Sequence, residues 1–270
     1  MYKLVLSATR GDVLDAFTGL KDVNRLMFEP FTVLDSAQAA IGELEKNGAD
    51  AVGYALPPDE EARLRSRLDA DYPHLPILRA DKAAGDPRAA LQLLREHLDQ
   101  LHGDFSDYGN DTVAGLARLR AELMHRLLEG KVRDRDELEA RLLMTRSKLS
   151  ADYPCFLFEF DVPEGQQYLD TRWHHGFERL DYALRANFFG RISGAMHYYA
   201  ALVSPSRLRV LAVSGETLTD AEVDVMSRGS HERVLSAAAQ VKDFMDLELV
   251  CRQFYALADL ASVVDHAPDR

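Results

Sequence analysis

The sequence predicts an α/β protein built as a parallel sheet, a helical segment and a second, α+β domain, in that order. Three observations predict it. Short apolar runs alternate with helix-length amphipathic stretches over the first hundred residues, leucines recur at helical spacing from about residue 104, and paired strand-like runs follow residue 150. A chain of 270 residues with 47% hydrophobic content can fill a core in each of two domains.

Residues 1–103 predict a truncated, flavodoxin-like sheet of the doubly wound kind. The expected strands lie in the runs YKLVLSA, FTVLDS, DAVGYAL and LPILRA, and the expected helices span 11–28, 36–47, 58–71 and 88–101. Strands joined by helix-length crossovers run parallel, with helices on both faces of the sheet. The third strand lies in ADAVGYALPP, is apolar on both faces and ends at Ala55, so its end offers no ionisable group.

Residues 104–150 predict a helical linker between the two domains. Asp111 is placed to cap the first helix, Gly130 to end it, and a second helix is expected to begin near Asp134. Both helices carry a row of leucines, namely Leu116, Leu119, Leu123 and Leu127 in the first and Leu138, Leu142, Leu143 and Leu149 in the second. Such a row packs within the chain or forms the seam of a homodimer, and the sequence leaves both arrangements open.

Residues 151–270 predict an α+β domain of the ferredoxin-like kind. The run PCFLFEFDV is an expected strand, and HYYAALVSPSRLRVLAVS contains two strands around a Ser-Pro-Ser turn. A further strand lies in LELVCRQFY, and helices are expected at 173–189, 219–245 and 256–265. The resulting βαββαβα order fits a ferredoxin-like sheet, a fold that hosts many unrelated functions.

This order of parts resembles the AraC-type response regulators of the YesN kind, in which a receiver precedes a helical segment and a divergent GGDEF-like domain. The resemblance covers most of the chain and rests on MYKLVLSA, ADAVGYALPP and LPILRA as receiver strands and LMHRLLEGKVRDRDELEARL as the linker. It implies a pseudo-receiver at 1–103, a helical linker at 104–150 and a degenerate GGDEF-like domain at 151–270. In that family a C-terminal helix-turn-helix pair binds DNA. This sequence ends at DHAPDR, so either a longer protein carries that pair or this regulator has none.

The resemblance also identifies the positions at which a receiver carries its phosphorylation chemistry. The acidic pair expected after the first strand falls on Ala8 and Thr9, the phosphoacceptor on Ala55, and the hydroxyl expected after the fourth strand near Arg79. The run LPILRADKAAGD leads directly into PRAALQLLREHL, without room for a fourth helix, a fifth strand and its lysine. Aspartyl phosphorylation requires a carboxylate nucleophile and a Mg²⁺ ion held by further carboxylates. We therefore expect no phosphate transfer to this domain.

The second domain lacks the residues that the resemblance implies for a cyclase. Glycines and acids are expected in the hairpin between the central strands, and this hairpin reads Ser204-Pro205-Ser206-Arg207. Glu159 and Asp161 share one face of the first strand and are weak candidates for a metal site. The alternative is a solvated or ion-paired strand end. We expect no cyclase activity, no catalytic residue and no cofactor, and the sequence assigns no cofactor-binding residue.

Charge and cysteine content exclude several classes of protein. The formal charge is −12, and residues 1–103 carry 12 basic and 17 acidic groups, residues 104–150 carry 9 and 9, and residues 151–270 carry 11 and 18. Without a basic patch, no strong DNA binding by this chain alone is expected. Cys155 and Cys251 lie in apolar runs, as buried reduced thiols do, and the N-terminus has no signal-peptide pattern. We expect a cytoplasmic protein without a membrane partner.

The sequence-based hypothesis is a non-catalytic, phosphorylation-independent regulatory protein related to response regulators. It would act in signal transduction or transcription regulation through protein partners or self-association, including a possible homodimer through the helices of 112–149. The alternative hypothesis is a small-molecule or nucleotide sensor that uses the degenerate GGDEF-like domain. An enzyme ranks third.

Overall fold

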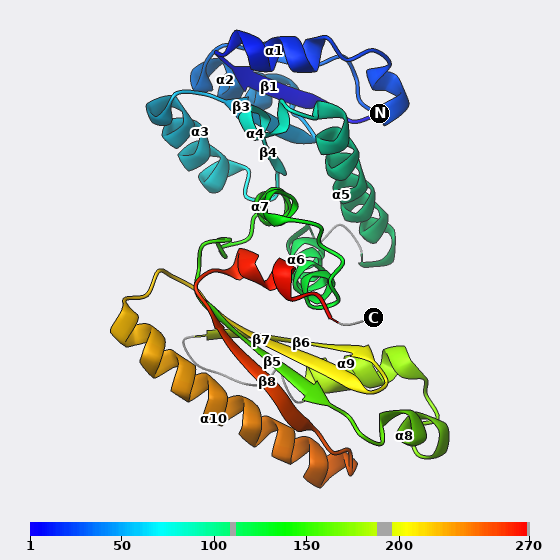
Figure 1. The fold of residues 1–270 in the computed structure, drawn as a ribbon. Helices are drawn as coiled ribbons and strands as arrows, with labels where there is room; N and C mark the ends of the chain where they lie inside the picture. Colours follow the sequence, from blue (N-terminus) through cyan, green and yellow to red (C-terminus); the bar gives the residue numbers. More distant parts are fainter. Residues whose placement is uncertain (109–111, 188–195, 269–270) are drawn as a thin grey trace. The chain divides into compact units, whose positions relative to one another are not determined.

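The structure, a computed structural model, describes residues 1–108, 112–187 and 196–268 of the chain. Two compact units make up the chain (Figure 1): Met1–Arg120 together with Ala140–Ser147, and Ala121–Glu139 together with Lys148–Arg270. The first unit contains a four-stranded parallel sheet and the second a separate four-stranded antiparallel sheet. The predicted mixed α/β organisation is therefore confirmed.

The parallel sheet of the first unit has the strand order β2-β1-β3-β4. Its strands are β1 (Leu4–Ala8), β2 (Thr32–Leu34), β3 (Ala51–Ala55) and β4 (Ile77–Arg79). All five residues of β1 and of β3 are buried, as the apolar runs predict for central strands covered on both faces. The two strands run in register along their whole length, so their carboxyl ends lie side by side.

Helices cover both faces of this sheet (Figure 1). They are α1 (Gly11–Thr18), the 3-10 helix η1 (Val23–Leu26), α2 (Ala37–Asn47), α3 (Pro58–Asp71), α4 (Ala80–Ala83) and α5 (Pro87–Tyr108). Leu4 and Leu6 of β1 pack in one core with Phe17 of α1 and with leucines of α5. Val5, on the opposite face, packs in a second core with leucines of α2 and α3.

Two of the helices expected in the first unit differ from the prediction. The helix expected at 11–28 ends at Thr18, and the rest of the range forms the short η1 between Asp22 (φ 63°) and Met27 (φ 66°), which both adopt the left-handed conformation. The helix expected at 88–101 extends to Tyr108. A single helical turn, α4, follows β4 where the sequence predicted a direct passage into the last helix.

The segment between the two sheets forms α6 (Thr112–Leu128) and α7 (Arg135–Met144), and both units take part of each helix. Gly130 ends α6 as predicted: it has φ 68°, its N–H donates to the carbonyl of Leu127, and Lys131 N–H donates to that of Arg126. Asp111, the predicted N-cap, lies outside the described residues. The chain itself buries six of the predicted leucines, namely Leu116, Leu119, Leu123, Leu127, Leu138 and Leu142, while Leu143 and Leu149 are half-buried.

The antiparallel sheet of the second unit has the order β6-β7-β5-β8 and the connectivity strand, helices, two strands, helix, strand. Its strands are β5 (Cys155–Asp161), β6 (Met196–Ser204), β7 (Arg207–Ser214) and β8 (Val250–Leu257). Its helices are α8 (Gly165–Thr171), α9 (Phe177–Asn187), α10 (Asp220–Met245) and the 3-10 helix η3 (Leu260–His266). One face of the sheet packs against α8, α9 and α10 through Phe156, Phe158 and Phe160 of β5.

The helices of the second unit contain two corrections to the prediction. The helix expected at 173–189 begins only at Phe177, after Gly176 (φ 82°), and a separate helix, α8, precedes Trp173. The terminal helix expected at 256–265 is wrong in its first residues, because β8 continues to Leu257 and Asp259 caps η3 through the backbone N–H of Ser262. In both places the helix begins only after a local turn or bend.

Candidate functional site

The structure brings together three of the positions that the resemblance associates with phosphorylation, namely Ala8, Thr9 and Ala55. Ala8 and Ala55 are the last residues of β1 and β3 and lie opposite each other in the parallel register. Thr9 N–H donates to the carbonyl of Ala55 at 3.2 Å. The methyl groups of Ala8 and Ala55 are buried in the core that also contains Leu78 and Ala80. The carboxyl end of the central strands therefore presents methyl groups and one exposed threonine.

Arginine–carboxylate pairs surround this end of the sheet. Arg79, at the end of β4, donates through Nε and Nη2 to both carboxylate oxygens of Asp81, at 2.9 and 2.7 Å. The pairing holds the pKa of Asp81 below its usual value. Asp12 accepts two similar bonds from Arg10. These carboxylates therefore already have charged partners, and a Mg²⁺ ion would have to displace an arginine to bind either of them.

Arg79 also connects the end of β4 to α3. Its guanidinium lies 5.5 Å from the ring centroid of Tyr54 and forms an ion pair with Glu61 at 3.5 Å. The hydroxyl of Tyr54 donates to the same Glu61 at 3.0 Å. The resemblance implies a hydroxyl side chain near this position. The structure instead has the guanidinium of Arg79, which pairs with Asp81 and with Glu61.

His97 of α5 is a buried titratable residue that the sequence analysis did not single out. It is 5% exposed, and within the described residues its Nε2 has no hydrogen-bond partner. Burial, together with the positive charge of Arg141, lowers its pKa from 6.5 to about 4. The folded unit therefore contains a neutral imidazole that the unfolded chain protonates at mildly acidic pH.

This depressed pKa predicts a loss of stability in acid. The pKa of His97 is lower in the folded state than in the unfolded chain, so the unfolded chain binds the proton first as the pH falls below 6.5. This proton uptake lowers the free energy of unfolding progressively until the pH reaches about 4. Between these limits we expect the residue to lower the free energy of unfolding of the first unit by about 3 kcal/mol. His97→Leu should remove this part of the pH dependence, whereas His74→Gln should leave it.

Urea unfolding at several pH values, followed by circular dichroism, measures the effect. Trp173 is the one tryptophan of the chain and lies in the second unit, so its fluorescence reports that unit separately. Equal pH dependence in His97→Leu and the unsubstituted protein would show that His97 is not the group responsible.

In the second unit the metal candidates Glu159 and Asp161 are paired with arginines. The register of β5 and β7 places Arg209 opposite Glu159 and Arg207 opposite Asp161. The corresponding ion pairs measure 3.2 and 2.6 Å. No group of three or more potential metal-ligating side chains is present in the part of the chain that the structure describes. The geometry of this strand end matches the ion-paired alternative considered from the sequence.

The loop after β5 is in direct backbone contact with the β6–β7 hairpin. Val162 N–H donates to the carbonyl of Ser206 at 2.8 Å. A Cβ atom added to Gly165, the first residue of α8, would lie 1.7 Å from the carbonyl oxygen of Pro205. Only glycine permits this approach, and the two segments leave no space between Gly165 and Pro205 for a phosphate group. The sequence did not indicate this contact, because its partners are about forty residues apart.

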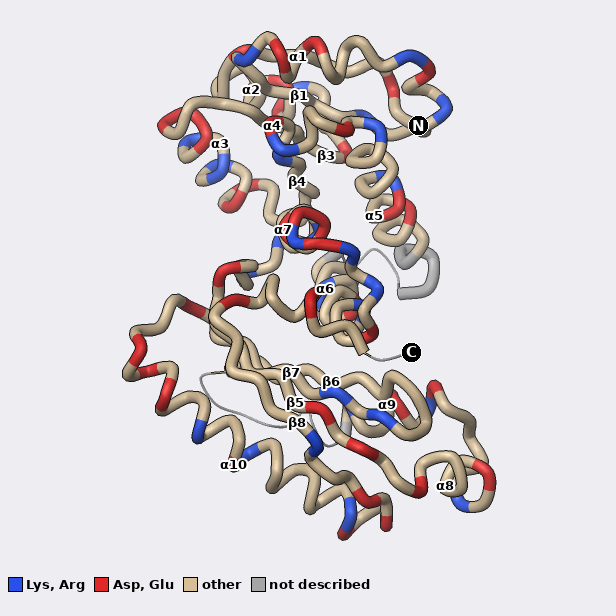
Figure 2. The backbone as a smooth tube through the Cα atoms, viewed as in Figure 1, with Lys and Arg blue, Asp and Glu red and all other residues tan. Residues whose placement is uncertain are grey.

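No protein-family model matches the chain, and no curated protein sequence matches it. Within the described residues, no helix combines the length and the apolar character needed to cross a lipid bilayer. Lysine and arginine are interspersed with aspartate and glutamate along α3, α7 and α10, as Figure 2 shows.

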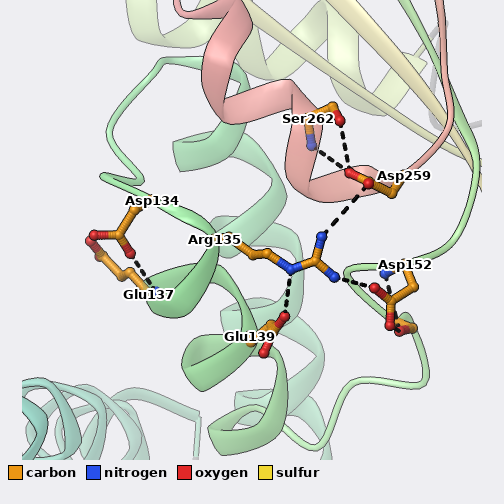
Figure 3. A network of polar contacts seen from close by, with 8 residues as sticks. Asp134, Arg135, Glu137, Glu139, Asp152, Asp259 and Ser262 are labelled. Atoms are coloured by element: carbon orange, nitrogen blue, oxygen red, sulfur yellow. Dashed lines mark hydrogen bonds and ion pairs between the residues drawn. The ribbon is translucent and has the colours of Figure 1, made fainter. Parts of the chain in front are cut away.

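Three arginines that the sequence analysis did not single out form polar contacts between segments far apart in the sequence. Arg209 of β7 is 2% exposed and reaches the carbonyl oxygens of Leu128 and His266. Arg135, at the start of α7, lies among Glu139, Asp152 and Asp259 (Figure 3). The third, Arg146, follows α7 and pairs with Asp69. In β7, an arginine alternating with apolar residues was the only signal in the sequence for such a role.

Proposed function

We propose that the chain is a cytoplasmic, non-catalytic regulatory protein of the response-regulator type, which acts through protein contacts and does not depend on phosphorylation. In this proposal the first unit is a truncated flavodoxin-like receiver without its acceptor, and the second a ferredoxin-like, GGDEF-like domain without cyclase activity. The strand order β2-β1-β3-β4 and the antiparallel sheet of the second unit support this assignment.

The observation that carries the proposal is the buried pair of Ala8 and Ala55 at the carboxyl end of the parallel sheet. In open α/β sheets this end is where ligands bind and reactions take place. A methyl group can neither attack a phosphoryl group nor coordinate the metal that neutralises it. The nearby Asp12 and Asp81 are held by arginines, so they offer no ready substitute for the missing acidic pair.

The contact between Gly165 and Pro205 supports the same proposal in the second unit. Joining two nucleotides requires room for a metal-bound triphosphate beside the central strands. Here the loop after β5 and the hairpin are in direct backbone contact, which leaves no such room between Gly165 and Pro205. Neither this contact nor the ion-paired Glu159 and Asp161 favours the alternative of a nucleotide sensor at this position.

The burial of the leucine rows bears on the kind of protein contact. Six of the eight leucines predicted as a possible dimer seam are buried within the chain itself. The proposed contacts therefore involve surfaces other than these rows. A second copy would need the helices of 112–149 to rearrange before the rows could form an interface.

We expect no phosphorylated or beryllofluoride-bound form of the first unit. Incubation of the full chain with acetyl phosphate, or with the beryllofluoride mimic and Mg²⁺, should leave the mass and the amide chemical shifts of residues 1–103 unchanged, because the acceptor and the metal ligands are absent. Ala55→Asp alone should not restore the reaction, since Ala8 and Thr9 still supply no carboxylate. A specific adduct in residues 1–103 of the unsubstituted protein would refute the proposal.

A further inference from the structure

Three arginines from three helical segments gather in the first unit. Arg65 lies on α3, Arg120 on α6, and Arg146 follows the end of α7. Arg120 donates through Nε to the carbonyl of Thr145 at 2.8 Å and through Nη2 to that of Arg146 at 2.9 Å. These bonds hold the end of α7 against α6 and place a second guanidinium next to the backbone of Arg146.

Arg146 occupies a position that favours glycine. Its φ is 53°, Arg146 N–H donates to the carbonyl of Leu143, and Ser147 N–H donates to that of Leu142. This is the arrangement that Gly130 forms after α6, where a residue without Cβ avoids the steric penalty of the left-handed conformation. Local conformation therefore does not explain the arginine, and its side chain is the remaining reason to place it there.

The guanidinium of Arg146 is buried and incompletely bonded. Its side chain is 7% exposed and forms an ion pair with Asp69 of α3. Within the described residues, its Nη1 is buried without a hydrogen-bond partner. Burial lowers the pKa of Arg146; Asp69 opposes this shift, and the positive charges of Arg65 and Arg120 add to it. A buried donor beside like charges is unfavourable unless an anion completes the site.

We propose that Arg65, Arg120 and Arg146 form a binding site for a small oxyanion of the phosphate class. Asp69 neutralises one of the three positive charges, and the remaining two match a dianion. Guanidinium groups bind phosphate oxygens through paired N–H donors, and Nη1 of Arg146 is such a donor.

Arg65 and Arg120 are half-buried, so both residues retain some exposure to solvent. Arg65 donates to the hydroxyl of Tyr54 at 3.4 Å, a long hydrogen bond that Arg65 exchanges for a phosphate oxygen at little loss. The Tyr54 hydroxyl keeps its bond to Glu61, and Glu61 keeps Arg79, so the rest of the polar network is unaffected. The site rests on these side chains alone and does not depend on the proposed regulatory function.

Calorimetric titration of the full chain tests the site. The probes are inorganic phosphate, glycerol phosphate as a monoester, and succinate as a dicarboxylate, each against potassium chloride at matched ionic strength. We expect saturable phosphate binding with a dissociation constant of about 1 mM or lower. Arg146→Gly should weaken it by about tenfold or more, because charge-assisted hydrogen bonds are lost. Glycine accepts a φ of 53°, so this variant should keep the fold and its unfolding temperature.

Arg63→Gln is the matched control, because Arg63 lies on the same helix as Arg65, its side chain is 60% exposed, and it forms an ion pair with Glu60. The affinity of the Arg63→Gln variant for phosphate should equal that of the unsubstituted protein. Binding of phosphate without the monoester would assign a free anion, and binding of both would assign the phosphate group of an organic ligand. The proposal is overturned by the absence of saturable phosphate binding up to about 10 mM. Equal binding of succinate, or unchanged binding in Arg146→Gly, would also overturn it.

Discussion

Replacing Arg209 with leucine is expected to lower the free energy of unfolding of the second unit by about 3–5 kcal/mol. The guanidinium of Arg209 connects three parts of that unit. Nη1 donates to the carbonyl of Leu128, the last residue of α6, at 2.6 Å, Nη2 donates to the carbonyl of His266, the last residue of η3, and Nε pairs with Glu159.

The expected effect is large because the substitution removes a hydrogen-bond donor from two carbonyls and the ion-pair partner from a carboxylate. The carbonyls in the last turn of a helix have no partner within the helix, and burying them unsatisfied is unfavourable. Burial lowers the pKa of Arg209, but the ordinary value of arginine is so high that the side chain remains charged. Leucine would fill the volume, yet it would leave two carbonyls without a donor and the Glu159 carboxylate without its ion-pair partner.

Arg207→Leu provides the control for the Arg209 substitution. Arg207 lies two residues earlier on the same strand and pairs with Asp161, but the two side chains are 37% and 42% exposed. An exposed pair contributes about 1 kcal/mol or less, so this variant should be nearly as stable as the unsubstituted protein. Combining Arg209→Leu with Glu159→Leu should recover part of the loss, because no uncompensated charge remains.

Urea unfolding followed by the fluorescence of Trp173 measures all four proteins, since this tryptophan lies in the second unit. If Arg209→Leu and Arg207→Leu reduce stability equally, then the buried contacts of Arg209 do not support the unit as described.

The strands were predictable because their signal is local. The runs that contain β1 and β3 are apolar over nearly the whole strand, and β5 begins with four buried residues, Cys155 to Phe158, so burial follows directly from composition. The end of α6 was predictable for the same reason, since Gly130 is the residue that the closing turn of a helix favours. At the end of α7 the same turn contains Arg146, so the glycine signal was absent.

The polar contacts of the candidate sites were less predictable than the fold because they join residues far apart in the sequence. Ala8 and Ala55 could be placed together, because the ends of adjacent parallel strands meet at one edge. Arg209 could not be connected to Leu128, 81 residues earlier, from any local pattern. Likewise, the boundary of the linker expected at 104–150 could not be located, because the leucines of α6 and α7 have the same spacing whichever unit they enter.

Gly165→Ala is expected to destabilise the second unit by about 3 kcal/mol. The new methyl carbon would lie 1.7 Å from the carbonyl oxygen of Pro205, and the neighbouring obstacle is backbone that no rotamer change can move. Either α8 or the hairpin must shift, and a shift breaks the 2.8 Å hydrogen bond from Val162 N–H to the carbonyl of Ser206.

Two further variants serve as controls for Gly165→Ala and show whether its loss of stability comes from the contact with Pro205. Gly229→Ala, in the interior of α10, places its methyl group where no atom outside the adjoining helix backbone lies within 4 Å and should stabilise the unit by about 0.5–1 kcal/mol. Pro205→Ala keeps the carbonyl that Gly165 approaches and should reproduce the stability of the unsubstituted protein to within about 1 kcal/mol. Unfolding in urea, read from Trp173, gives all three values.

The result for Gly165→Ala also bears on function. A large loss of stability would mean that the loop after β5 and the hairpin are held in contact, and a nucleotide would have to break that contact to bind between them. If Gly165→Ala is as stable as Gly229→Ala, the two segments must lie apart in solution, and the space between them could then admit a phosphate group. Titration of that variant and of the unsubstituted protein with guanine nucleotides would then measure binding at the place where the proposed function expects none.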